Sequence, residues 1–116
     1  MDRVRFTTIE DNDDLVLSFS FEEGTVFGID GFIIQRTPKL EFTLRPYERG
    51  PAIDWTAEDE IITVQEIVLS RAVVVIKTHY DTYSFDISKI SAEEFKGVID
   101  ILHKMNFDNA FKFSYS

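Results

Sequence analysis

An alternation of large apolar residues with smaller ones, early in the chain, constrains the fold most strongly. Every second residue from Leu15 to Phe21 is Leu or Phe, and the residues between them are Val16, Ser18 and Ser20. Successive side chains of a β-strand point to opposite faces of the sheet, so a period of two places all the large residues on one face. The pattern predicts a strand with one buried face, which must belong to a sheet that has a core.

The same reasoning predicts strands along most of the chain. They are expected at Val4–Ile9, Gly31–Arg36, Leu40–Leu44, Ile61–Leu69, Ala72–Ile76 and Tyr83–Ile87. The phase of the pattern slips at Gln65-Glu66, which predicts a β-bulge or a change of strand. Phe111, Phe113 and Tyr115 also alternate with smaller or polar residues, and this predicts a final edge strand or an ordered tail.

One helix is expected, and it begins after Ser91. Ser91 and Glu94 have the Ser-x-x-Glu spacing of a capping box, in which each side chain accepts a hydrogen bond from the other residue's backbone amide. Asn106 is expected to end the helix in the left-handed conformation. Apolar residues recur at helical spacing on one face: Phe95, Val98, Ile99, Leu102 and Met105.

Many strands followed by one helix predict an α+β fold. We expect an antiparallel β-sheet of about six to eight strands, with one C-terminal helix packed on one face. The 116 residues are close to the commonest size of one domain, so residues 1–116 are expected to form a single α+β domain. The sequence has no apolar run that approaches the roughly 20 residues of a membrane-spanning helix, and it does not begin with a signal-peptide pattern. We therefore expect a cytoplasmic protein.

The charge of the chain narrows the choice of partners. Twelve Lys and Arg against 21 Asp and Glu give a formal net charge of −9. Such a surface repels nucleic-acid phosphates and anionic membranes, so neither is expected as a partner. It attracts basic proteins and speeds their encounter, although acidity also simply keeps a protein in solution.

The sequence contains no recognisable catalytic or metal-binding motif. It has no cysteine, no nucleophile elbow and no glycine-rich phosphate loop. His79 and His103 are far apart, and the acids between Asp11 and Asp14 lack the glycine and the distal glutamate of a calcium loop. We therefore expect no catalytic residues, no metal, no cofactor and no enzymatic activity.

The stretch from Tyr47 to Glu60 loses all periodicity and is predicted to be a long loop. Long loops in compact domains are often functional. This one combines residue types that anchor interfaces with a cluster of acids, so it is the predicted partner-binding site. Trp55 either packs back onto the sheet, which is the commoner arrangement, or anchors a partner. The candidate residues are Tyr47, Arg49, Asp54, Trp55, Glu58, Asp59 and Glu60.

The second half of the chain resembles bacterial polymorphic-toxin immunity proteins, in particular the group called immunity protein 10. The resemblance lies in the order of an acidic-start strand, a β-branched strand, a Phe-centred strand and a closing helix, together with an early strand that ends in Gln-Arg. The matching segments are Val64–Arg71, Val73–Ile76, Ser84–Ile87, Ala92–Phe95 and Phe32–Arg36. The resemblance implies a small acidic protein that inhibits a toxin made next door, and it assigns no site residue. The segment Arg49-Gly50-Pro51 departs from the pattern of that group.

The first hypothesis is therefore an immunity-type protein that binds and inhibits a cognate, basic bacterial toxin through an acidic surface. If the toxin is a nuclease, the loop carboxylates would take the place of nucleic-acid phosphates. The alternative is a small ligand-binding domain or enzyme with a cavity between sheet and helix, in which Arg45 and Arg49 hold an anion. A monomer or weak homodimer is expected, and pairing through the Phe111–Tyr115 edge is a third possibility.

Overall fold

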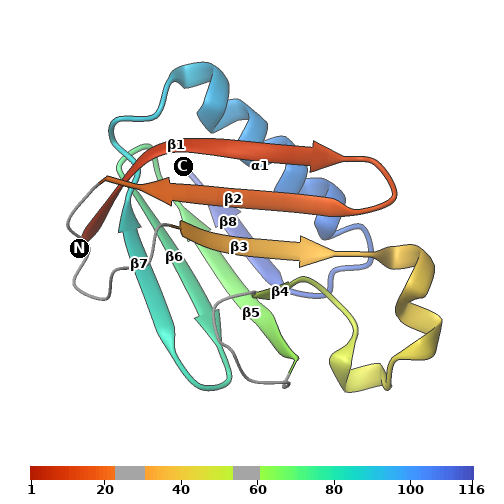
Figure 1. Ribbon diagram of the computed structural model, residues 1–116. Coiled ribbons are helices and arrows are strands. Elements are labelled where there is room, and N and C mark those ends of the chain that lie inside the picture. The colour runs from red at the N-terminus through yellow and green to blue at the C-terminus, as the bar shows by residue number, and fades with distance from the viewer. Residues whose placement is uncertain (23–30, 54–60) are drawn as a thin grey trace.

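The computed structural model describes residues 1–22, 31–53 and 61–116, and it confirms the α+β fold (Figure 1). Within these residues, eight strands form one mostly antiparallel sheet, and one α-helix follows the seventh strand. The strands are β1 (Asp2–Asp11), β2 (Leu15–Phe21), β3 (Gly31–Arg36), β4 (Ala52–Ile53), β5 (Ile62–Leu69), β6 (Val73–Thr78), β7 (Thr82–Asp86) and β8 (Lys112–Tyr115). The helix is α1 (Ala92–Met105), and two short 3-10 helices, η1 (Pro38–Thr43) and η2 (Pro46–Glu48), lie between β3 and β4.

The strand order is β4-β3-β2-β1-β7-β6-β5-β8, and β4 also pairs with β5. The sheet therefore curves until β4 meets β5, and strands β1 to β7 form a closed ring. Two pairings are parallel: Asp2 and Arg3 of β1 with the end of β7, and β8 with β5. One edge of β5 is shared, because β4 pairs with Ile62 and Thr63 while β8 pairs with the later part, Glu66–Leu69.

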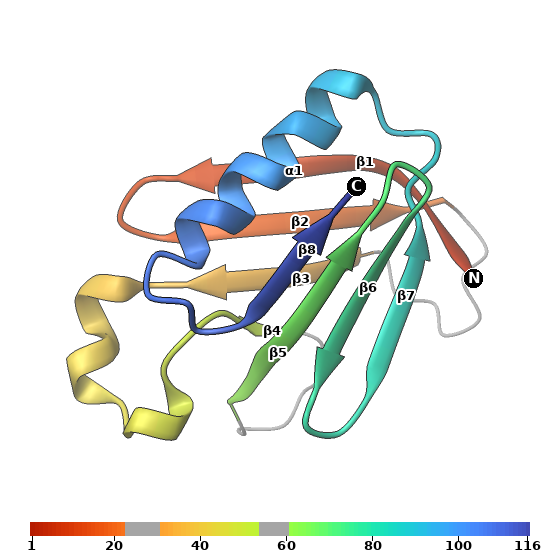
Figure 2. The ribbon, with the colours of Figure 1, turned by 180° about the vertical axis from the view of Figure 1, so that it is seen from behind.

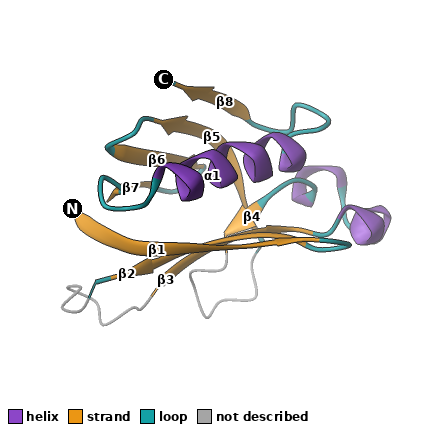
Figure 3. Ribbon diagram, turned by 90° about the horizontal axis from the view of Figure 1, so that it is seen from above, coloured by secondary structure: helices purple, strands orange, loops and turns teal. Residues whose placement is uncertain are grey.

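The closed sheet forms two layers, and α1 lies between β1 and β8 (Figure 3). The same helix crosses in front of β1 and β2 when the molecule is seen from behind (Figure 2). The interior is rich in phenylalanine, with the rings of Phe21 and Phe32 centred 4.8 and 5.0 Å from that of Phe85. The helix contributes Val98, Ile101, Leu102 and Met105 to this core, and all four are buried.

The predicted capping box is confirmed and extended by a tertiary contact. The Ser91 side chain accepts from the Glu94 amide at 3.0 Å, and Glu94 Oε1 accepts from the Ser91 amide at 3.4 Å. The other carboxylate oxygen of Glu94 accepts from the amide of Thr7 at 2.7 Å and from its hydroxyl at 3.1 Å. One side chain therefore begins the helix and also satisfies a backbone amide on the edge of β1.

Two further predictions about the sheet are confirmed. The register between β5 and β6 shifts between Val64 and Glu66, where the sequence pattern slips. The aromatic C-terminal run forms β8, which stands at the end of the strand order beside β5. This pairing is parallel, which no local sequence pattern predicts.

The predicted strand at Leu40–Leu44 is wrong. Pro38 occupies the start of η1, where its fixed backbone angle favours a helical turn, and the Thr43 hydroxyl donates to the Leu40 carbonyl at 2.6 Å. Leu40 and Phe42 alternate in sequence, yet their side chains are 59 % and 77 % exposed. The alternation of apolar residues in this segment therefore does not correspond to a buried face of a strand.

The predicted loop from Tyr47 to Glu60 is also more structured than expected, since η2 reaches into it and β4 lies within it. Gly50 connects these two elements with a φ of 119°, a conformation that favours glycine. Asn106 ends the helix with a φ of −100° rather than the predicted left-handed conformation. Asn109, three residues later, takes that conformation, with a φ of 56°.

Candidate functional site

The outer face of the closed sheet carries one continuous row of side chains across five strands. Glu10 of β1 lies opposite Val16 of β2, and Val16 opposite Gln35 of β3. Gln35 lies opposite Ala52 of β4, which lies opposite Thr63 of β5. Because side chains alternate along each strand, this row points away from the buried residues and from α1.

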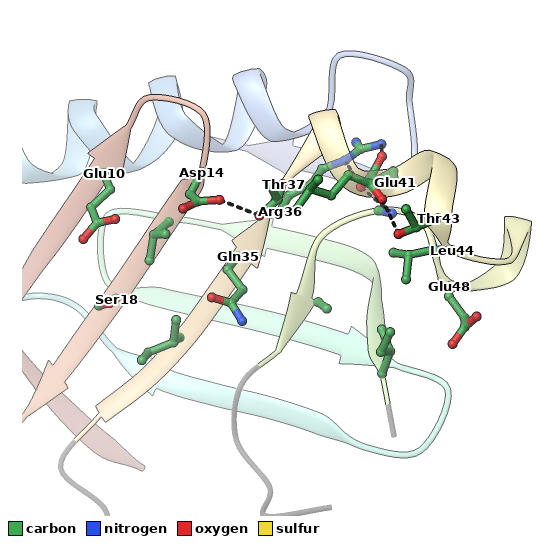
Figure 4. Close-up of a pocket in the computed structure, with 16 residues that line it drawn as sticks. Glu10, Asp14, Ser18, Gln35, Arg36, Thr37, Glu41, Thr43, Leu44 and Glu48 are labelled. Carbon is green, nitrogen blue, oxygen red and sulfur yellow. Dashed lines mark hydrogen bonds and ion pairs between the residues drawn. The ribbon is translucent and has the colours of Figure 1, made fainter. Parts of the chain in front are cut away.

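A hollow of about 670 Å³ lies over this row, with η1 and η2 beside it (Figure 4). Its floor consists of outward-facing strand residues, and its other sides are formed by the segment from Thr37 to Gly50 and by Ile61. The apolar lining residues are Val16, Ile33, Leu40, Leu44, Ala52 and Ile61; the polar ones are Glu10, Asp14, Ser18, Gln35, Arg36, Thr37, Glu41, Thr43 and Glu48.

Arg36 holds η1 against the rest of the molecule. It has the inward parity of Phe32 and Ile34 on β3, and it is only 3 % exposed. Its Nε and Nη2 donate to the two oxygens of Glu41 at 2.8 Å each. Its Nη1 and Nη2 donate to the two oxygens of Asp108 at 2.8 and 2.7 Å, and Nη1 also donates to the Met105 carbonyl at 2.6 Å. All five N–H groups of the guanidinium are therefore used.

Hydrogen bonds within this cluster favour the charged forms of Arg36, Glu41 and Asp108. Burial opposes the charge of Arg36, but hydrogen bonds to Asp108 and Glu41 outweigh it and raise the pKa of the guanidinium. The hydrogen bonds from Arg36 lower the pKa of both the Glu41 and the Asp108 carboxyl groups, against the opposing effect of burial. Glu41 also accepts from the Gly50 amide at 3.1 Å. One positive charge is thus matched by two negative charges, and Arg36 has no N–H left for an anionic ligand.

The carboxylates at the two ends of the hollow are held more loosely. At the β1–β2 end, Asp14 Oδ1 accepts from the Thr37 hydroxyl at 2.7 Å. At the η2 end, Glu48 Oε1 accepts from the Arg45 amide at 3.2 Å. Glu10 has no hydrogen-bond or ion-pair partner in the described part of the chain. Carboxylates only accept hydrogen bonds, so these ends suit ammonium or guanidinium groups.

A second hollow of about 320 Å³ continues from the first and shares Glu48 and Ile61 with it. Tyr47 and Tyr80 line it, and their side chains are 70 % and 65 % exposed. The remaining lining residues are Ile62, Thr63 and His79. Aromatic side chains with this exposure are typical of the residues that anchor protein interfaces.

Two of the seven candidate residues, Tyr47 and Arg49, lie in the part of the chain that the structure describes, and only Tyr47 lines a hollow. Tyr47 lines the second hollow, and its hydroxyl accepts from Arg45 Nη1 at 2.8 Å. Arg49 donates from Nε to the Leu44 carbonyl at 3.2 Å and lines neither hollow. The other five candidates, Asp54, Trp55, Glu58, Asp59 and Glu60, lie outside the described residues.

The sequence reasoning missed the side of the hollow that belongs to β1, β2 and β3. Glu10, Asp14 and Gln35 belong to no motif, since each is an ordinary polar residue in or beside a strand. Parity along the strands was a usable signal, because it places Gln35 outward and Arg36 inward. The alignment of Glu10 with Gln35 depends on the register of three strands, which no local pattern reveals.

In comparisons with family models, with curated proteins and with solved structures, the chain matched none. Within residues 1–22, 31–53 and 61–116, no three histidine, aspartate or glutamate side chains are grouped so that they could hold a metal ion. No helix in these ranges is both long enough and apolar enough to cross a membrane.

The larger hollow lies on the face of the sheet that the ligand-binding alternative does not use. That alternative places a cavity between sheet and helix, where Val98, Ile101, Leu102 and Met105 are buried instead. It also requires Arg45 and Arg49 to hold an anion, and neither residue lines this hollow. The geometry therefore favours recognition of cationic and apolar groups at the outer face of β1–β4.

Proposed function

We propose that this chain is an immunity-type protein that binds a basic toxin and inhibits it. The observation that carries the proposal is the hollow on the outer face of β1–β4, which combines a partly apolar floor (Val16, Ile33 and Ala52 around Gln35) with carboxylates at both ends. Interfaces between proteins typically have an apolar centre and a polar rim, and the hollow has this arrangement in concave form.

The charge of the whole chain supports the same partner. A formal net charge of −9 accelerates the encounter with a basic protein and repels nucleic acid. A nuclease is a suitable target, because its substrate site must be positively charged to receive phosphates. Glu10, Asp14 and Glu48 would pair with such a site, while Tyr47 and Tyr80 supply aromatic contact area beside them.

Co-purification with the product of the adjacent reading frame tests the proposal, since immunity proteins of the kind that this sequence resembles act on a toxin made next door. The tagged protein is expressed together with that product, and the complex is measured by calorimetry. We expect a 1:1 complex in which the toxic activity is silenced. If the tagged protein captures no neighbour and protects no cell, the immunity proposal is wrong.

Charge reversal then tests the surface. The double variant Glu10→Lys, Glu48→Lys is expected to associate about tenfold more slowly at low salt, because steering depends on the local charge. Glu93→Lys, Asp100→Lys changes the net charge equally on the exposed side of α1 and is the matched control. The pair Glu58→Lys, Asp59→Lys tests the acids predicted from the sequence. Equal slowing by all three variants would show that only the net charge matters.

A further inference from the structure

The larger hollow is longer across the strands than along them. Across the strands it runs from Glu10 through Val16 and Gln35 to Ala52, and then to Ile61, which directly precedes β5. Along the strands it spans three outward-facing positions, since Asp14, Val16 and Ser18 all line it, and this width is about 13 Å. Neighbouring strands lie about 4.8 Å apart, so the length is about 14 Å from β1 to β4 and about 19 Å to β5.

This shape matches one extended stretch of polypeptide. An extended chain advances about 3.3 Å per residue, so about five residues fit between the two ends. Alternate residues of such a segment face the floor, and residues i and i+4 lie about 13 Å apart. That distance matches the three strand spacings that separate Glu10 on β1 from Ala52 on β4. Glu10 and Glu48 line opposite ends of the hollow (Figure 4).

The middle of the hollow offers a hydrogen-bonding group to such a segment. The Gln35 side chain is exposed, and within the described residues its amide has no hydrogen-bond partner. An amide both donates and accepts, so it can pair with the backbone of a segment whatever the sequence of that segment. Val16, Ile33 and Ala52 around it give the floor an apolar character.

We propose that the larger hollow receives a single extended segment of the partner, about five residues long, with basic residues at positions i and i+4. One basic side chain reaches Glu10 and Asp14, and the other reaches Glu48. This inference rests on the proposed function, because it specifies how the basic partner is recognised. It adds the spacing of the two charges and the direction of the segment across the strands.

The test uses the isolated protein, labelled with ¹⁵N, and synthetic peptides as probes. The first peptide is acetyl-Lys-Ser-Val-Ser-Lys-amide, which carries the proposed spacing. The second, acetyl-Lys-Lys-Ser-Val-Ser-amide, has the same composition and charge with adjacent lysines, and the third replaces both lysines of the first by Glu. Backbone amide shifts at Val16, Gln35 and Ala52 are the readout.

We expect the spaced peptide to shift these amides and to bind up to about fivefold more tightly than the adjacent one, the contribution of one well-placed exposed ion pair. The acidic peptide should cause no shift. Equal binding of the two lysine peptides, the absence of shifts with the spaced one, or shifts centred on the helix acids Glu93 and Asp100 would each overturn the proposal.

Two single variants sharpen the result. Gln35→Lys places a positive charge in the middle of the hollow and should abolish the response, whereas Ser84→Lys, at an exposed position of β7, should leave it unchanged. If both variants respond as the wild type does, the peptide lies elsewhere. The titration needs no toxin, so its failure is distinct from a failed co-purification, which contradicts the immunity proposal itself.

Discussion

Replacing Glu94 by glutamine should destabilise the protein far more than the same change at its neighbour Glu93. Glu94 accepts from the amide and hydroxyl of Thr7 at 2.7 and 3.1 Å, and from the amide of Ser91 at 3.4 Å. A glutamine amide keeps one oxygen, which will face Thr7 because those contacts are shorter. The Ser91 amide then faces an NH₂ group, and the bonds from Thr7 lose their charge assistance.

The magnitude follows from the strength of these bonds. A hydrogen bond to a charged group contributes about 1.5–3 kcal/mol, and a neutral one about 1 kcal/mol. Glu94→Gln should therefore lower the free energy of unfolding by about 1–2 kcal/mol, and Glu94→Ala by about 2–3 kcal/mol. For a domain of this size, about 1 kcal/mol corresponds to a fall in Tm of roughly 4 °C.

Glu93→Gln is the matched control, because it removes the same charge from the same helical turn. Glu93 is exposed and makes no hydrogen bond or ion pair in the described part of the chain. Its loss changes only the favourable interaction with the helix dipole, which both variants share. The difference between the two variants in urea unfolding therefore measures the contacts of Glu94 with Thr7 and Ser91.

The effect should also depend on pH. The hydrogen bond from the Thr7 amide lowers the pKa of the Glu94 carboxyl below its ordinary value of 4.5, against the opposing effect of burial. The folded state therefore binds this proton less readily than the unfolded state. The contribution of the ionised carboxylate to the free energy of unfolding is fully present above the pKa of the unfolded state. It is lost as the pH falls through the lower folded pKa. The gap between wild type and Glu94→Gln should be constant at neutral pH and should shrink below about pH 4.5. The reasoning would be refuted if the difference in free energy of unfolding between wild type and Glu94→Gln did not change with pH, or if Glu93→Gln had an equal effect.

Three further substitutions should change stability in different directions, and urea unfolding at neutral pH measures each. Arg36→Met removes the guanidinium that donates to two carboxylates and a carbonyl, and it leaves Glu41 only its bond from the Gly50 amide, so we expect the free energy of unfolding to fall by about 3–5 kcal/mol; a fall smaller than that of Glu94→Gln would contradict the account of the cluster. Gly97→Ala should stabilise the helix by up to about 1 kcal/mol, because the new methyl group meets only the end of the Ile9 side chain, at 3.1 Å. Gly31→Ala should destabilise by about 1–3 kcal/mol, because its methyl group would lie 2.8 Å from the Phe19 carbonyl oxygen. The same sign for both glycine variants would show that these distances do not decide the outcome.

Local sequence patterns were sufficient to predict elements that have a regularly spaced apolar face or a local capping motif. The alternation at Leu15–Phe21 and the capping box at Ser91 reflect forces that act within one element, so strand and helix form where expected. The alternation at Leu40 and Phe42 failed because a period of two does not show whether a face is buried. Pro38 and the contact of Glu41 with Arg36 decide the conformation there instead.

The hollow was harder to predict, because it depends on how distant strands align. The pairing of Glu10 with Val16 and of Val16 with Gln35 sets one row across three strands, and each register depends on the whole sheet. The burial of Arg36 could have been inferred from its inward parity, but its partner Asp108 lies beyond the helix, 72 residues away. Contacts at such separations leave no trace in a local sequence pattern.

The shared guanidinium of Arg36 also has a consequence for hydrogen exchange. It joins η1, the last turn of α1 and the Asp108 loop through Glu41, Met105 and Asp108. If any one of these segments moves away, part of the buried guanidinium loses its hydrogen-bond partner, so the three should open together as one cooperative unit. Their slowly exchanging amides should therefore show a common opening free energy. A ligand seated beside η1 would then slow exchange in the final helical turn, a part of the molecule that it does not touch.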